Sequence, residues 1–304
     1  MKSGILASTF AAAAMAGTPM VASAQEAALV FKPAGPWAID YGDDYCRLGR
    51  KFMNGTTELD VALERIQPGT PLRLILLSDA INTYRSATQI GWHFLPSDAE
   101  RKAFLSHGQT ATGQKYFNLG QVTLAPFVMP APGTPPAPPP PYSREDEQAT
   151  AKGFTGIVLD SGVVKPIEVD TESLAAPVAA LQACADDLAK SWGLDPAKLK
   201  GGTPAIPNGG GVGWLPQGTI DFGDFAKLSG GANQVRLMVD ASGKPTECHV
   251  HWPSLDKSVN DKICATLMTN AKFTPAKDAG GQPMAGYWVG DPLFMGPPMK
   301  GFGR

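Results

Sequence analysis

The stretch ICATLMTNAKFTPAKDAGGQP, residues 263 to 283, decides how the C-terminal part of the chain folds. Val259, Ile263 and Leu267 recur every four residues, a spacing that places apolar side chains on one face of a helix. Pro275 cannot continue a helix, because it lacks the amide donor and its ring clashes with the preceding turn. The pattern therefore predicts a helix that ends shortly before this proline.

The residues after the helix predict a turn and a closing strand. We expect Phe273 to pack into the core as the helix ends. Gly280 and Gly281 tolerate the backbone conformations that a tight turn requires. A last strand is then expected from about Tyr287.

A β-hairpin is expected before the helix. Apolar residues alternate between positions 235 and 239, residues 242–244 suit a turn, and TECHVHW (246–252) returns as the partner strand. Ser254 is placed to cap the helix. Residues 220–304 are therefore expected to form a small ββαβ domain, in a chain of the α+β class.

These residues resemble the C-terminal domain of TonB, the periplasmic energy transducer, especially its variants with a cysteine pair between strand and helix. The resemblance rests on D-x-x-G-K-P in the hairpin (240–245), the cysteine-bearing helix, FTPAKDAGGQP (273–283) and the closing aromatic strand. It covers residues from about 220 to 296. It implies a binding module whose last strand pairs with an extended peptide from an outer-membrane transporter or another envelope protein. The matching positions are Tyr287, Trp288, Val289, Leu293 and Phe294.

The N-terminus has the layout of a secretory signal peptide. Lys2 precedes an Ala-rich apolar run that reaches the small residues Ala22, Ser23 and Ala24, so cleavage is expected after Ala24. Loss of residues 1–24 would leave a periplasmic protein that is not inserted in the membrane. The alternative is an uncleaved anchor, which would make the chain a membrane-anchored energy transducer.

The composition of the 304-residue chain excludes some classes of partner. The chain contains 26 basic and 28 acidic residues, a formal charge of −2, and no strongly basic block. Neither nucleic acid nor an anionic membrane surface is therefore an expected partner. No complete phosphate-binding loop and no G-x-S-x-G elbow occurs, so we expect no cofactor and no enzymatic activity.

Residues 25–205 are expected to form a β-rich domain with one or two helices. Short apolar runs separated by turn residues predict antiparallel strands. In PSDAERKAFLSHG (96–108), Ser97 and Glu100 fit a capping box and predict one helix. The apolar stripe of APVAALQACADDLAKSWGL (176–194) predicts a second helix.

Two segments rich in proline or glycine interrupt these patterns. Residues 130–141 include eight prolines and are expected to be a stiff loop inside the first domain. Residues 206–219 are dense in Gly and Pro without periodicity, so we expect them to be the linker between the domains.

The four cysteines predict disulfides, because an exported chain meets an oxidising compartment. Four cysteines allow three pairings. Sequence proximity favours Cys248 with Cys264, which leaves Cys46 with Cys184. A bond between the latter two would pin the helix at 176–194 onto the first strands.

Two further groups of residues are candidate sites. His249 and His251 alternate onto one strand face and could share a metal ion, but exposed strand histidines are commoner and no third ligand is apparent nearby, so no metal site is expected. Asp160 lies in a D-S-G turn and, with Asp170 and His93, defines the alternative function of a periplasmic hydrolase.

Overall fold

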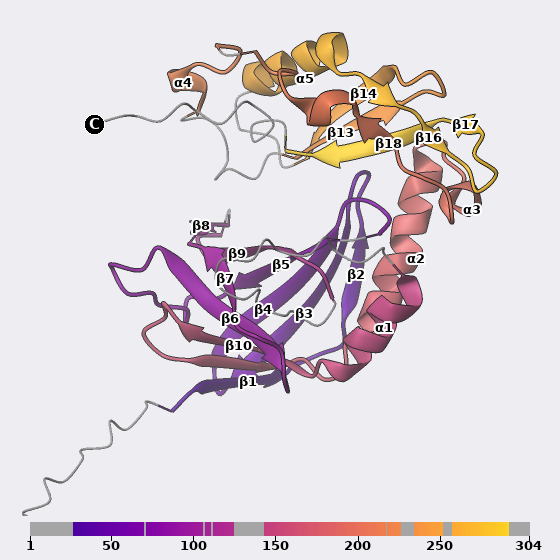
Figure 1. Ribbon diagram of the computed structural model, residues 1–304. Helices are drawn as coiled ribbons and strands as arrows, with labels where there is room; N and C mark the ends of the chain where they lie inside the picture. Colours follow the sequence, from indigo (N-terminus) through magenta and orange to yellow (C-terminus); the bar gives the residue numbers. More distant parts are fainter. Residues whose placement is uncertain are drawn as a thin grey trace, which may run out of the picture.

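The structure is a computed structural model that describes most of the chain, namely residues 27–69, 71–105, 107–110, 112–124, 143–216, 218–225, 234–251 and 257–291. The expected signal peptide (1–24) and Pro-rich loop (130–141) lie outside these residues. The fold is α+β, as expected, and contains two large hydrophobic cores. One core belongs to an N-terminal domain with a large curled sheet, and the other to a smaller C-terminal domain above it (Figure 1).

The N-terminal domain is built on an 11-stranded sheet. Its order is β7-β6-β10-β11-β1-β3-β4-β5-β9-β8, with β2 paired to β3, and all neighbours are antiparallel except β1 and β11. The sheet curls until β7 lies against β9 (Figure 1). The strands are β1 (Leu29–Pro33), β2 (Ala38–Tyr41), β3 (Cys46–Asn54), β4 (Thr57–Arg65), β5 (Leu72–Leu77), β6 (Gln89–Leu95), β7 (Arg101–Phe104), β8 (His107–Gln109), β9 (Lys115–Val122), β10 (Gly156–Ser161) and β11 (Ile167–Asp170).

Two helices pack against one another beside this sheet, α1 (Arg144–Gly153) and α2 (Ala175–Ser191). The apolar stripe predicted for α2 is buried, and its Cys184 is bonded to Cys46 of β3. Sequence reasoning missed α1, which buries little apolar surface and begins at a serine N-cap, Ser143. Figure 1 shows α2 running from the curled sheet to the C-terminal domain.

A buried ion pair joins α1 to the sheet. The Arg65 guanidinium, on β4, donates to both carboxylate oxygens of Glu147 at 2.5 and 3.2 Å, and Gln182 of α2 donates to the same carboxylate at 2.8 Å. Both charged side chains are almost completely buried. Such a pair requires both partners, because either charge alone would be desolvated without compensation.

The prediction of a helix at residues 96–108 is wrong. Residues Arg101–Phe104 form strand β7, antiparallel to β6, and Phe104 is 80% exposed. Asp98 pairs with Arg101 across a turn at 2.7 Å. The edge of β6 offers this segment a complete backbone ladder, and that tertiary pairing overrides a weak local helix signal.

The C-terminal domain contains a three-stranded sheet with the order β14-β13-β18. Strands β13 (Gln234–Val239) and β14 (Pro245–His251) form the predicted hairpin, and β18 (Gly286–Gly290) pairs antiparallel with β13. Helix α5 (Lys257–Asn270) covers one face of this sheet through its apolar stripe. Cys264 of α5 is bonded to Cys248 of β14, as sequence proximity favours, and the remaining two cysteines form the second disulfide, so both predicted pairings are present.

Two turns in this domain share the sequence D-A-x-G-x-P, at 240–245 and at 278–283. In each turn, one aspartate oxygen accepts hydrogen bonds from the amides two and four residues later, at 2.8 to 3.0 Å. The second turn joins β16 (Ala276–Lys277) to β17 (Pro283–Met284). The glycine at the fourth position of each turn has a positive φ, 87° at Gly243 and 80° at Gly281.

The expectation of a linker at 206–219 is wrong for the described part of this segment. Strand β12 (Ile206–Pro207) pairs with β15 (Phe273–Thr274), and Trp214 is only 5% exposed. The Trp214 ring lies 4.9 Å from the Phe273 ring and 5.4 Å from the Trp288 ring. The segment therefore completes the C-terminal core. The remaining short elements are α3 (Pro196–Leu199), η1 (Asn208–Gly211) and α4 (Phe222–Phe225).

Candidate functional site

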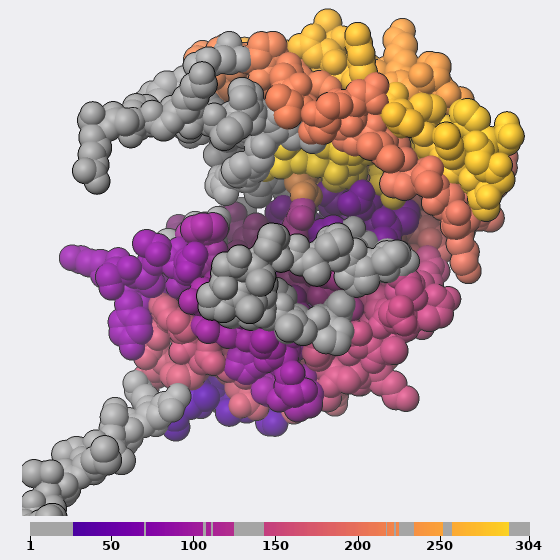
Figure 2. Space-filling model, in the orientation of Figure 1, coloured from indigo at the N-terminus to yellow at the C-terminus, as the bar shows by residue number. Residues whose placement is uncertain are grey.

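The two domains meet along the face of the C-terminal sheet that α5 does not cover. Met238 of β13 packs there against Ala189 and Leu194, and the Arg236 guanidinium lies 4.1 Å from the centre of the Trp192 ring. These partners lie at and just beyond the C-terminal end of α2. Figure 2 shows the two domains in contact toward the right of the view. The second face of the small sheet is thus occupied by the N-terminal domain.

Tyr287 of β18 also belongs to this boundary. Its hydroxyl donates to the carbonyl of Pro68 at 3.3 Å, and its ring lies edge-on to Trp192, 5.3 Å between centroids. Burial raises the pKa of Tyr287 above its ordinary value, so the phenol is a neutral donor. The Tyr287 side chain therefore links the two domains.

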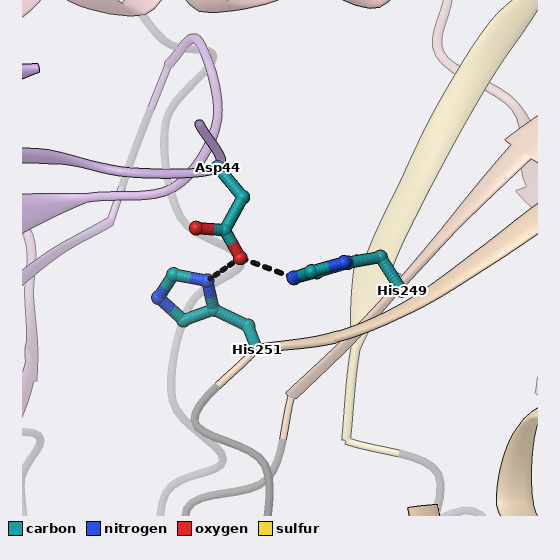
Figure 3. A group of neighbouring side chains, drawn as sticks. All are labelled: Asp44, His249 and His251. Atoms are coloured by element: carbon teal, nitrogen blue, oxygen red, sulfur yellow. Dashed lines mark hydrogen bonds and ion pairs between the residues drawn. The ribbon is translucent and has the colours of Figure 1, made fainter. Parts of the chain in front are cut away.

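A polar cluster lies at the same boundary. Asp44, in the turn between β2 and β3, meets His249 and His251, which project from one face of β14. Figure 3 shows both rings directed at a single carboxylate oxygen, Oδ2 of Asp44. His251 Nδ1 lies 3.2 Å from that oxygen, and His249 Nε2 contacts it as well. Hydrogen bonds from His249 and then His251 hold the pKa of Asp44 far below its ordinary value.

A second carboxylate lies behind this cluster. Glu64 Oε1, on β4, is 3.5 Å from His251 Nε2, and Glu64 is also paired with Arg47. Burial acts to raise the pKa of Glu64, but His251 and Arg47 outweigh it, so the pKa lies below its ordinary value. Burial lowers the pKa of the neighbouring Arg73 to about 10. The cluster therefore combines two imidazoles, two carboxylates and two guanidinium groups.

The expectation that the two histidines are exposed and lack a third ligand is corrected by this geometry. His251 is only 4% exposed, and Asp44 approaches from a point about 200 residues earlier in the chain. The sequence signal for Asp44 is a paired Asp-Asp in a turn, two residues before a cysteine. That signal does not indicate which distant strand the turn will meet.

The residues expected to line a peptide-binding edge lie in different surroundings. Trp288 packs into the C-terminal core against Trp214 and Phe273, whereas Val289 is half-buried and lies opposite Arg236. Leu293 and Phe294 lie outside the described residues. Within the described part of the chain, β18 pairs with β13 alone and forms an edge of the sheet.

The hydrogen-bonding pattern of the hairpin indicates which β18 groups face outward. Residues of a middle strand bond alternately to one neighbour and the other. The backbone amide of Asp240 donates to the carbonyl of Lys244, just before β14, so the even-numbered residues of β13 direct their backbone groups to β14. The odd-numbered residues of β13, such as Leu237, are therefore expected to bond to β18. Trp288 lies opposite Leu237 in the register. Tyr287 and Val289 therefore direct their backbone N–H and C=O groups to the unpaired edge.

The residues of the hydrolase alternative do not assemble as a group. His93 Nδ1 lies 3.6 Å from Asp160 Oδ2, whereas Asp170 accepts a hydrogen bond from Lys32 at 2.9 Å. Asp170 is opposite Gly156, so it lies about four residues, or roughly 13 Å, along the sheet from Asp160. The two carboxylates therefore do not form the close pair that shares a proton.

Comparisons with protein-family models, with curated proteins and with solved structures found no match to this chain. None of the helices in the described residues is long and apolar enough to cross a membrane. The function of this chain is therefore inferred from the geometry of its two domains and of the boundary between them.

Proposed function

We propose that this chain is an exported, noncatalytic periplasmic protein that binds an extended peptide along the outer edge of β18. The ligand would be a segment of an outer-membrane transporter or of another envelope protein. The observation that carries the proposal is the edge position of β18, with two residues whose backbone groups face outward. The resemblance of residues 220–296 to the TonB C-terminal domain supports it.

Several structural features fit this role. The order β14-β13-β18, with α5 on one face, is the arrangement expected of the ββαβ domain. The other face is occupied by the N-terminal domain, which leaves the strand edge as the surface for pairing. Because Tyr287 and Trp288 are committed to packing, affinity would come mainly from backbone hydrogen bonds.

The proposal is tested with the complete mature chain and synthetic peptides from the N-terminal segments of outer-membrane transporters of the same host. Val289→Pro removes one outward donor at an edge position where proline is tolerated, so we expect binding to weaken about tenfold or more in calorimetric titration. Val289→Thr retains the donor and serves as the matched control. Equal binding by both variants, or no binding of any such peptide by the wild type, would refute the proposal.

Export is tested by the intact mass of protein recovered from the periplasm of a Gram-negative host. We expect a chain that begins at Gln25 and resists thiol alkylation unless it is reduced, since all four cysteines are bonded. Recovery of the full-length chain in the membrane fraction would instead support the anchored-transducer alternative.

A further inference from the structure

The boundary between the domains brings together three side chains that are typical metal ligands. Asp44 comes from the N-terminal domain, and His249 and His251 from the C-terminal domain. One ligand atom of each, an oxygen or a ring nitrogen, lies within 4.8 Å of the others. Their convergence on one point, visible in Figure 3, is independent of the β18 edge.

The spacing of these atoms suits a small divalent ion. Ligand atoms about 2.0–2.1 Å from a tetrahedral zinc ion lie about 3.3 Å from one another. His251 Nδ1 and Asp44 Oδ2 are separated by 3.2 Å. His249 Nε2 is in contact with the same oxygen and would move outward by a small side-chain rotation to admit an ion. Its side chain is 40% exposed and has room for this movement.

A second observation comes from the far side of the His251 ring. Its Nε2 faces Glu64 Oε1 at 3.5 Å, and Glu64 is completely buried and paired with Arg47. A histidine that ligates a metal through one nitrogen usually directs the other N–H to a carboxylate or carbonyl, which fixes the ring orientation. Glu64 is in the position of that supporting carboxylate, which a simple histidine–aspartate contact would not require.

We propose that Asp44, His249 and His251 bind one divalent transition-metal ion of the zinc type and thereby fasten the C-terminal domain to the N-terminal domain. Two imidazoles and a carboxylate favour zinc over calcium or magnesium, which prefer oxygen ligands. The half-exposed His249 provides access from solvent. Three protein ligands leave a fourth position for water.

The test uses the mature chain after treatment with EDTA, titrated with zinc chloride in competition with a chromophoric chelator. We expect one zinc ion per chain and a melting temperature that rises with zinc concentration, because binding to the folded state alone stabilises it. Cobalt(II) should give the strong visible absorption of a tetrahedral site.

Variants locate the ion and keep the test independent of folding. His249→Ala and Asp44→Asn, at partly exposed positions, should abolish stoichiometric binding, and Glu64→Gln should weaken it by about 10- to 100-fold. His93→Ala, which removes a histidine beside another aspartate, is the control and should bind zinc normally. Absence of stoichiometric binding by the wild type, or unchanged binding by His249→Ala and Asp44→Asn, would overturn the proposal.

Discussion

At the scale of single residues, Gly243 is the position where the hairpin turn contacts the FTPA segment, residues 273–276. Its carbonyl accepts a hydrogen bond from the amide of Phe273 at 3.1 Å. Its φ is +87°, and a Cβ there would lie 2.1 Å from the Phe273 carbonyl oxygen. Both the backbone conformation and the close approach therefore require glycine.

Replacement of this glycine should destabilise the C-terminal domain. We expect Gly243→Ala to lower the free energy of unfolding by about 2–4 kcal/mol, from backbone strain together with displacement of the FTPA segment. Gly281→Ala is the matched control, because φ is +80° there but nothing lies within 4 Å of the added Cβ. It should lower the stability by only about 1 kcal/mol. Urea denaturation measures both, and an equal loss would show that the close approach is unimportant.

At the scale of secondary-structure elements, α1 is held by charge more than by apolar burial. Its buried residues are Glu147 and Ala151, and Glu147 meets Arg65 of β4 in the interior. Gln182 of α2 binds the same carboxylate. One side chain of α1 thus joins a strand and a second helix.

Removal of this carboxylate should therefore loosen α1 and α2 together. We expect Glu147→Ala to lower the free energy of unfolding by about 3–5 kcal/mol, because the Arg65 charge would remain buried without a partner. The double variant Arg65→Met/Glu147→Leu should recover most of that loss. Asp187→Ala, which removes an exposed pair with Lys190, should leave the urea midpoint unchanged. A small effect of Glu147→Ala would show that water reaches Arg65.

At the scale of the whole molecule, the C-terminal domain begins earlier than its sequence motifs indicate. Ala205, Trp214 and Ile220 belong to its core, and β12 pairs with β15. The domain is also covered on its second face by the end of α2. The N-terminal boundary of this domain is therefore defined by core packing and not by the Gly- and Pro-rich segment at residues 206–219.

Fragments of two lengths test this boundary. We expect a fragment of residues 200–304 to unfold at a higher temperature than a fragment of residues 220–304, since the shorter one lacks Trp214, which packs between two core aromatic rings. Circular dichroism at the same concentration measures both transitions. Equal melting temperatures would show that residues 206–219 are dispensable for the fold.

The sequence alone determined the parts of the structure that depend on neighbouring residues. The helix periodicity at 259–267, the stop near Pro275, the hairpin turn and the proximity-favoured disulfide between Cys248 and Cys264 are all present. Period, turn chemistry and cysteine spacing act over short distances, so they can be read from the chain directly. Only the tertiary structure decided that residues 101–104 form a strand, that residues 206–219 join a core, and that Asp44 meets His249 and His251. Those outcomes depend on contacts between distant segments, which form only when one complete surface packs against another.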